Sequence, residues 1–259
     1  MADADPTQGR PYRNLELARL PTVALNKRHL VEHKVVGLDS RDTRSRAFNL
    51  LRTRLTGLLE GPGPFLIGIT SATPAAGKSF ISTNLAISLA KVSEGEVILV
   101  DLDLRRGSVA TELGLDVQHG GIGDVLRGEK ALQEVGVSID ALPLTIFPTQ
   151  IVHSQSAELL AGDEYSGLID TLRRQTPGTI VLFDLPPVFA NDDAMLSIGQ
   201  LDGYILVVDS TETSRAHVQE AMAMLEPARC VGTVLNRYSG KMFEKYGYGS
   251  AAYMKYYER

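Results

Sequence analysis

The chain has 259 residues, 44% of them hydrophobic and 22% charged, which is the composition of an ordinary globular protein and excludes a disordered, collagen-like or coiled-coil chain. A formal net charge of −5 disfavours a protein that binds nucleic acid over its whole surface, and we expect no nucleic-acid partner. The single cysteine, Cys230, cannot form an internal disulfide, which favours a protein of a reducing compartment. Because Cys230 stands in an apolar strand pattern, we predict that it is a small core residue.

The first part of the chain divides into an arm and a helix. Residues 1–37 are polar and contain three prolines, so we predict a flexible N-terminal arm with some local order around Leu20 to Leu30 and without an apolar signal core. From 44 to 60 apolar residues recur with the spacing of one helix face, and the sequence GPGP at 61–64 ends the pattern. No apolar run approaches the ~20 residues of a membrane-spanning helix.

Short apolar runs alternate with helical patterns along the rest of the chain. They predict strands at 65–70, 96–101, 143–147, 179–184, 204–210 and 230–236, and the helices between them include 78–92 and 214–225. Continuous apolar strands that alternate with helices indicate an α/β fold, a mostly parallel sheet with helices on both faces. We therefore predict one domain over 38–237, including the leading helix.

A phosphate-binding loop follows the first of these strands. Gly77-Lys78-Ser79 matches the end of the pattern G-x-x-x-x-G-K-[ST], with Ala72 at the position of its first glycine. Lys78 would reach the β- and γ-phosphates of a nucleotide, and the Ser79 hydroxyl would ligate Mg²⁺. The backbone that would cradle the phosphates is formed by Ala75, Ala76, Gly77, Lys78, Ser79 and Phe80.

Acidic residues end two of the predicted strands. Asp101 and Asp103 follow one strand, and Asp184 follows another. A single aspartate at a strand end can be a helix cap or a turn residue. Because ligands of open α/β sheets bind at the carboxyl ends of strands, we expect the three carboxylates to converge with the phosphate loop on one Mg²⁺–nucleotide site.

Three motifs together resemble a known family. SATPAAGKS (71–79), ILVDLDLRRG (98–107) and IVLFDLPP (180–187) are similar to the nucleotide motifs of the bacterial tyrosine kinases (BY-kinases) of capsule and exopolysaccharide systems. These kinases are P-loop NTPases related to MinD and ParA, and the resemblance covers about residues 40–237. The MinD/ParA branch usually carries a lysine five positions before the P-loop lysine, where this chain has Thr73.

The chain departs from the family pattern at two places. Where the family loop usually reads Pro-Gly-Glu-Gly-Lys, Pro74 is followed here by Ala75 and Ala76, and alanine in place of glycine restricts loop geometry. The family's ring-assembly motif Glu-x-x-Arg-x-x-Arg corresponds to Arg46, Asn49 and Arg52, of which Arg52 alone matches. The arginine-rich segment 41–54 is a solvated helix face, a subunit contact or a surface for anionic membranes.

The resemblance implies an ATP- and Mg²⁺-dependent protein-tyrosine autokinase. Lys78 would neutralise phosphate charge. Asp101 and Asp103 would bind Mg²⁺, directly or through water, or would orient the incoming tyrosine hydroxyl and accept its proton. Asp184 would hold Mg²⁺ through water. Asn236 resembles the family's adenine contact, although by spacing alone it is equally a turn residue. Arg105 would hold phosphates or the tail, or pair with an aspartate.

The tyrosines are concentrated at the C-terminus, where residues 238–259 hold six of the nine. Their spacing has neither helical nor strand period, so we predict a flexible tail whose tyrosines accept phosphate in a neighbouring subunit's active site. A packed aromatic stripe and a partner-binding tail are the alternatives. The predicted phosphoacceptors are Tyr246, Tyr248, Tyr253, Tyr256 and Tyr257.

The resemblance also implies partners. In the family the kinase often pairs with a transmembrane chain-length regulator, a polysaccharide co-polymerase that activates it, so we expect a cytoplasmic protein held at the inner face of the membrane through this partner. Self-association and a cognate tyrosine phosphatase are further expectations. The alternative functions are a MinD/ParA-like positioning ATPase and a catalytically weak nucleotide-binding scaffold.

Overall fold

The computed structural model of the chain describes residues 15–39, 42, 44–152 and 154–238. Within this part, eight strands form one sheet in the order β1-β4-β5-β3-β6-β2-β7-β8. All neighbouring strands run parallel except β4 and β5. The strands are β1 (Thr22–Val23), β2 (Phe65–Ser71), β3 (Val97–Asp101), β4 (Val137–Ile139), β5 (Leu144–Phe147), β6 (Ile180–Asp184), β7 (Gly203–Asp209) and β8 (Cys230–Asn236).

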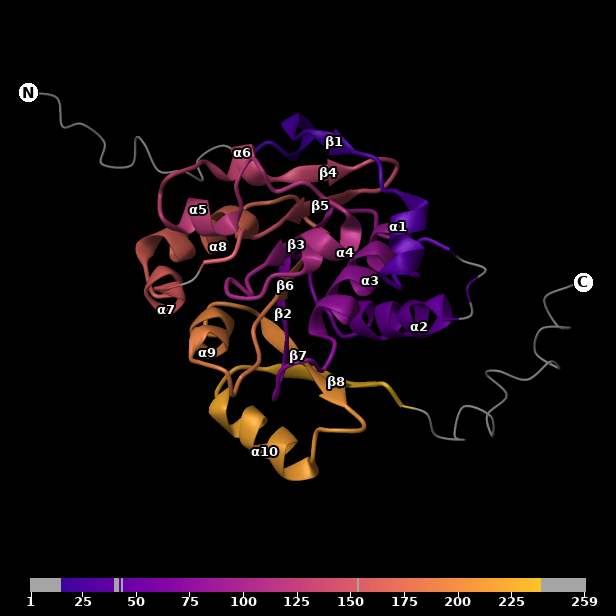
Figure 1. The fold of residues 1–259 in the computed structure, drawn as a ribbon, viewed down its shortest axis with the longest axis vertical. Helices are drawn as coiled ribbons and strands as arrows, with labels where there is room; N and C mark the ends of the chain where they lie inside the picture. Colours follow the sequence, from indigo (N-terminus) through magenta and orange to yellow (C-terminus); the bar gives the residue numbers. More distant parts are fainter. Residues whose placement is uncertain (1–14, 40–41, 43, 153, 239–259) are drawn as a thin grey trace, which may run out of the picture.

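Helices cover both faces of the sheet (Figure 1). One face carries α1 (Lys27–Glu32), α2 (Ser45–Thr56), α3 (Lys78–Ala90) and α4 (Val109–Leu113). The other carries α5 (Ile122–Leu126), α6 (Leu132–Val135), α7 (Ser156–Leu160), α8 (Asp163–Arg173), α9 (Asp193–Ile198) and α10 (Arg215–Met224). This arrangement confirms the predicted α/β class. No helix of the described residues is long and apolar enough to cross a bilayer.

Two hydrophobic cores lie on opposite faces because strand side chains alternate. On β2, Leu66 packs into the core under α8, whereas Ile67 packs into the core under α3. Both side chains are at most 1% exposed. The central strands are therefore buried on both faces, which is why they read as continuous apolar runs in the sequence.

The predicted strands and helices exist with small shifts of their ends. The leading helix is α2, which stops at Thr56, ahead of the GPGP sequence. The strand predicted at 143–147 is β5, and its antiparallel neighbour β4 was not predicted. β4 has three residues, too few for a clear alternation of apolar and polar side chains.

The order in residues 15–37 extends beyond the local order predicted around Leu20 to Leu30, so the prediction of a flexible arm is wrong for the rest of this segment. A 3₁₀ turn, η1 (Leu17–Arg19), precedes β1, which pairs with β4 through Thr22 and Ser138, and α1 follows. Leu20 and Leu30 are 5% and 3% exposed, so this segment contributes to the cores. Its elements have two to six residues and cannot show the periodicity that marks longer ones. Residues 1–14 and the tail beyond 238 lie outside the described part.

Candidate active site

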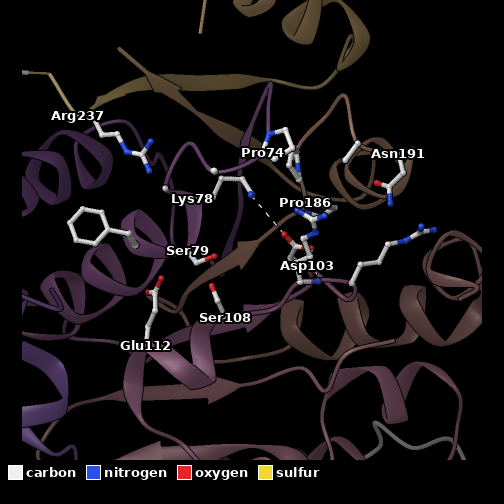
Figure 2. A pocket seen from close by; sticks show the side chains of 16 residues that line it. Pro74, Lys78, Ser79, Asp103, Ser108, Glu112, Pro186, Asn191 and Arg237 are labelled. Carbon is white, nitrogen blue, oxygen red and sulfur yellow. Dashed lines mark hydrogen bonds and ion pairs between the residues drawn. The ribbon is translucent and has the colours of Figure 1, made fainter. Parts of the chain in front are cut away.

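A pocket of about 570 Å³ opens where β2, β3 and β6 end (Figure 2). Parallel strands end at the same edge of a sheet, so segments far apart in the sequence meet there. The pocket is lined by Pro74, Ala75, Gly77, Lys78, Ser79, Phe80, Asp103, Arg105, Arg106, Ser108, Glu112, Pro186, Pro187, Ala190, Asn191 and Arg237. Seven residues predicted from the sequence are among them, namely Ala75, Gly77, Lys78, Ser79, Phe80, Asp103 and Arg105.

The phosphate loop joins the end of β2 to the first turn of α3. Gly77 has a φ of 89° and Ala75 a φ of 61°, both in the left-handed region. A Cβ atom at Gly77 would lie 2.3 Å from Nδ2 of Asn236, so this position needs glycine for space as well as for its dihedral angle. α3 begins at Lys78, so its free backbone N–H groups face the pocket and suit an anion.

Lys78 and Asp103 face one another across the pocket (Figure 2). The Nζ atom of Lys78 lies 3.8 Å from Oδ2 of Asp103, and the two side chains are 7% and 8% exposed. Burial raises the pKa of Asp103 above its usual value, although the positive charges of Lys78 and Arg106 oppose the shift. Of the three predicted carboxylates, Asp103 is the one that lines the pocket.

Asp101 and Asp184 lie behind the pocket wall, directly opposite one another on β3 and β6. Both are fully buried. Asp184 accepts hydrogen bonds from the hydroxyls of Ser79, at 2.5 Å, and Ser82, at 2.9 Å. Asp101 accepts the backbone N–H groups of Asp103 and Val109, each at 3.2 Å.

The two buried carboxylates have perturbed acidities. Burial raises the pKa of Asp101 well above its usual value, and the charge of Asp184 adds to the rise. Burial raises the pKa of Asp184 to about 6, against the opposing effects of Lys78 and of the hydroxyls of Ser79 and Ser82. A cation bound beside these carboxylates would oppose the effect of burial, because a nearby positive charge favours the ionised form.

The residues present fit Mg²⁺. Magnesium prefers oxygen ligands and is usually held by one or two carboxylates together with substrate phosphates and water. The Ser79 hydroxyl supplies such a group at the pocket surface, and the buried carboxylates of Asp184, which it contacts, and of Asp101 would act on the metal through water. Among the described residues no cluster of three or more acidic, histidine or cysteine side chains could hold a metal alone.

Asn236 contacts the phosphate loop rather than the pocket. Its Nδ2 donates to the carbonyl oxygen of Ala76 at 2.8 Å, and its Oδ1 accepts the backbone N–H of Arg237 at 2.9 Å. Ala76, which belongs to the phosphate loop, is fully buried. Arg237, which was not predicted, lines the pocket and pairs with Asp209 at 2.7 Å.

Arg105 lines the pocket with half of its side chain exposed. Its Nε donates to the Ser156 hydroxyl at 2.8 Å and lies 3.8 Å from Oδ2 of the buried Asp193. Of the alternatives predicted for Arg105, the structure thus shows the ion pair with an aspartate, Asp193. Glu112 was also missed; the only sequence signal for it is an acidic residue shortly after the D-x-D-x-R motif. The predicted phosphoacceptors Tyr246, Tyr248, Tyr253, Tyr256 and Tyr257 lie outside the described residues.

Comparison with known proteins identifies relatives of this chain, although no protein-family model matches it. It is 32% identical over 203 residues to EpsB of Ralstonia nicotianae, a tyrosine-protein kinase by name. That match covers 77% of this chain but 26% of EpsB, so the chain spans about a quarter of the length of this relative. It is 29% identical to the tyrosine-protein kinase YwqD of Bacillus subtilis, covering 70% of this chain and 75% of YwqD.

Solved structures agree with these relatives. The kinase domain of the Escherichia coli tyrosine kinase ETK superposes with a TM-score of 0.68 at 25% identity, over 80% of this chain and 82% of that one. The cell-division ATPase MinD of Pyrococcus furiosus shares the fold, with a TM-score of 0.59 at 21% identity, over 68% of this chain and 73% of that one. With its phosphate loop, its strand-end carboxylates and these relatives, the chain belongs to the bacterial tyrosine kinase family.

Proposed function

We propose that the chain is an ATP-dependent protein-tyrosine kinase that phosphorylates tyrosines of its own C-terminal segment, residues 238–259, between neighbouring copies. The observation that carries this proposal is the meeting of Lys78 and Asp103 in one pocket above the buried pair Asp101 and Asp184. In a member of this family, that pocket supplies both a phosphate-binding cation and a carboxylate for the acceptor hydroxyl.

The phosphate side of the site is formed by the loop and α3. Backbone N–H groups of residues 75–80 would hold the phosphates, and Lys78 would balance the charge on the β- and γ-phosphates. Ser79, Asp101 and Asp184 would hold Mg²⁺, which supplies charge stabilisation to the transferred phosphoryl group. Ser79 and Asp184 are already in hydrogen-bond contact, so these groups are positioned before a nucleotide arrives.

The acceptor side is formed by Asp103. A tyrosine hydroxyl beside it would donate a hydrogen bond to the carboxylate. As the new O–P bond forms, the bond between the γ-phosphorus and the β–γ bridging oxygen breaks, and ADP leaves. The tyrosine proton passes to the carboxylate of Asp103, whose raised pKa makes it a better acceptor than an exposed aspartate. Fully buried Asp101 cannot reach a hydroxyl in the pocket in this way.

The family suggests the setting of this reaction. We propose a role in capsule or exopolysaccharide production, with activation by a membrane-spanning chain-length regulator and reversal by a tyrosine phosphatase. The kinase would then act at the inner face of the membrane through its partner. Self-association is required by transfer between copies.

The test is phosphorylation of the purified chain with ATP and Mg²⁺, with and without the cytosolic segment of the regulator. Mass spectrometry should find phosphate on tyrosines of 238–259 in the wild type and in the exposed control Lys27→Met, but not in Lys78→Met. Mixing Lys78→Met with an active chain whose tail tyrosines are phenylalanine should phosphorylate the Lys78→Met tail if transfer is intermolecular. ATP hydrolysis with an unmodified tail would favour a MinD-like ATPase instead.

A further inference from the structure

Glu112 is an acidic residue of the pocket for which the proposed kinase reaction has no role. It lies on α4, whose first turn is fixed by a hydrogen bond from its backbone N–H to the carbonyl oxygen of Ser108, at 2.9 Å. Its carboxylate points toward the hydroxyls of Ser79 and Ser108 at the lower end of the pocket (Figure 2). Three oxygen-bearing side chains, from the first turn of α3 and from α4 and its N-cap, therefore line this end of the pocket.

One oxygen of the Glu112 carboxylate lacks the hydrogen-bond partner that a buried polar atom requires. Its Oε2 atom is buried without a hydrogen-bond partner among the described residues, and no ion pair joins it to a described lysine or arginine. Burial raises the pKa of Glu112 to about 7, the nearby Thr83 hydroxyl opposes the rise, and the charge of Asp184 adds to it. Because a buried carboxylate oxygen without a hydrogen-bond partner destabilises the fold, the position of this atom at the pocket indicates a ligand that supplies a hydrogen-bond donor or positive charge.

We propose that Glu112 is a positioning residue for Mg²⁺ at this site, accepting hydrogen bonds from water molecules of the metal's coordination shell. The proposal rests on the nucleotide-binding part of the proposed function and not on phosphoryl transfer. Magnesium keeps several of its waters when it binds proteins, so a carboxylate next to the Ser79 hydroxyl has donors to accept from.

Contacts with α1 hold α4, and with it Glu112, in place. The carbonyl oxygen of Thr111, the residue before Glu112, contacts Nε2 of His29 on α1 at 2.7 Å. The Cα atom of Gly114, at the end of α4, also faces the His29 ring. The segment that carries Glu112 is therefore held against α1 from outside while its carboxylate faces the pocket. Such outer-sphere partners orient a metal site, and their loss typically weakens metal binding about 10- to 100-fold.

The test measures metal binding without measuring catalysis. A fluorescent ADP analogue is titrated into the wild type and into Glu112→Gln, first in EDTA and then at increasing free Mg²⁺. We expect the Mg²⁺ concentration that gives half of the affinity increase to rise about 10-fold in Glu112→Gln. In EDTA, binding should be unchanged or tighter, because a negative charge near the phosphates has been removed.

The control is Glu158→Gln, the same change at an exposed position on α7, which should behave as the wild type. Thermal unfolding reports whether each variant is folded, and Glu112→Asp, which keeps the charge on a shorter side chain, provides a second variant with an intermediate effect. Wild-type Mg²⁺ dependence in Glu112→Gln overturns the inference. A wild-type chain whose ADP affinity does not respond to Mg²⁺ overturns both proposals, whereas Mg²⁺-coupled binding without tail phosphorylation overturns the kinase alone.

Discussion

Asn236 donates a hydrogen bond to the carbonyl oxygen of Ala76 at 2.8 Å, joining residues 160 positions apart in the sequence. This contact connects the last residue of β8 to the phosphate loop. Beside it, Arg237 extends into the pocket wall and pairs with Asp209 on β7. The end of β8, where the chain turns toward its C-terminal segment, is thus attached to the loop that would hold the phosphates.

This contact predicts how Asn236→Ala changes nucleotide binding. The variant removes a hydrogen bond of about 1 kcal/mol, so the affinity for ADP should fall about fivefold. Because the contact holds the loop and not the base, GDP should lose the same factor. Titrations with both nucleotides test this, with Thr233→Ala, an exposed change on the same strand, as control. A loss confined to adenine nucleotides would instead support the adenine contact that the family resemblance suggests.

The two alanines of the phosphate loop should respond oppositely to replacement by glycine. Ala75 has a φ of 61°, which costs a residue with a Cβ atom about 1 kcal/mol. Ala75→Gly should therefore raise stability by about 0.5 kcal/mol after the entropy of glycine in the unfolded chain is allowed for. Ala76→Gly should lower stability by about 1–2 kcal/mol, because Ala76 is fully buried and lacks this strain.

Thermal unfolding distinguishes the two changes. The melting temperature should rise by about 1–2 °C in Ala75→Gly and fall by several degrees in Ala76→Gly. A lower melting temperature in Ala75→Gly would mean that the alanine at this position is not strained. If Ala75→Gly also raises the phosphorylation rate, the alanine that replaces the usual glycine of the family loop slows catalysis in this chain.

The sequence was sufficient to place the carboxylates because their positions follow from the sheet. Asp101 and Asp184 end buried, parallel strands that are neighbours in the sheet, and such strands end together, so their meeting could be predicted. The hydrogen bond between Asn236 and Ala76 could not be predicted, because no local sequence pattern at either residue indicates a contact across 160 positions. Glu112 was missed because the five-residue α4 has too few turns for a helical pattern.

The acidity of Glu112 predicts a pH-dependent stability of the chain without bound metal. Its pKa is raised from 4.5 to about 7 in the folded chain, so between these values the folded chain binds more protons than the unfolded chain. Stability is therefore lost as the pH rises from about 4.5 to 7. The shift corresponds to at most about 3 kcal/mol.

Glu112→Gln removes this dependence. Its melting temperature should equal that of the wild type near pH 4.5 and exceed it by several degrees at pH 8. Melting curves at both values in EDTA measure the difference, and Glu158→Gln should show none. Equal melting temperatures at pH 8 would mean that the carboxylate already has a partner in the folded chain.

Arg52 is the residue that matches the family's ring-assembly motif, yet its side chain is used inside the molecule. Its Nη1 donates to the carbonyl oxygen of Ser88 on α3 at 2.9 Å, and the Ser88 hydroxyl in turn donates to Asn49 at 3.1 Å. These bonds hold α2 against α3, next to the edge-to-face contact of Phe48 and Phe80. Phe80 lines the pocket, so α2 also supports one wall of the site.

Arg52→Ala should therefore destabilise the monomer. A partly buried hydrogen bond from a charged donor contributes about 2 kcal/mol, so the melting temperature should fall by about 4–8 °C. Arg54→Ala, an exposed change on the same helix, should leave it within about 1 °C. Sedimentation velocity on the same samples separates stability from assembly. A reduced oligomer size with an unchanged melting temperature would return Arg52 to a role between subunits, since a residue engaged with Ser88 cannot be removed without loosening α2.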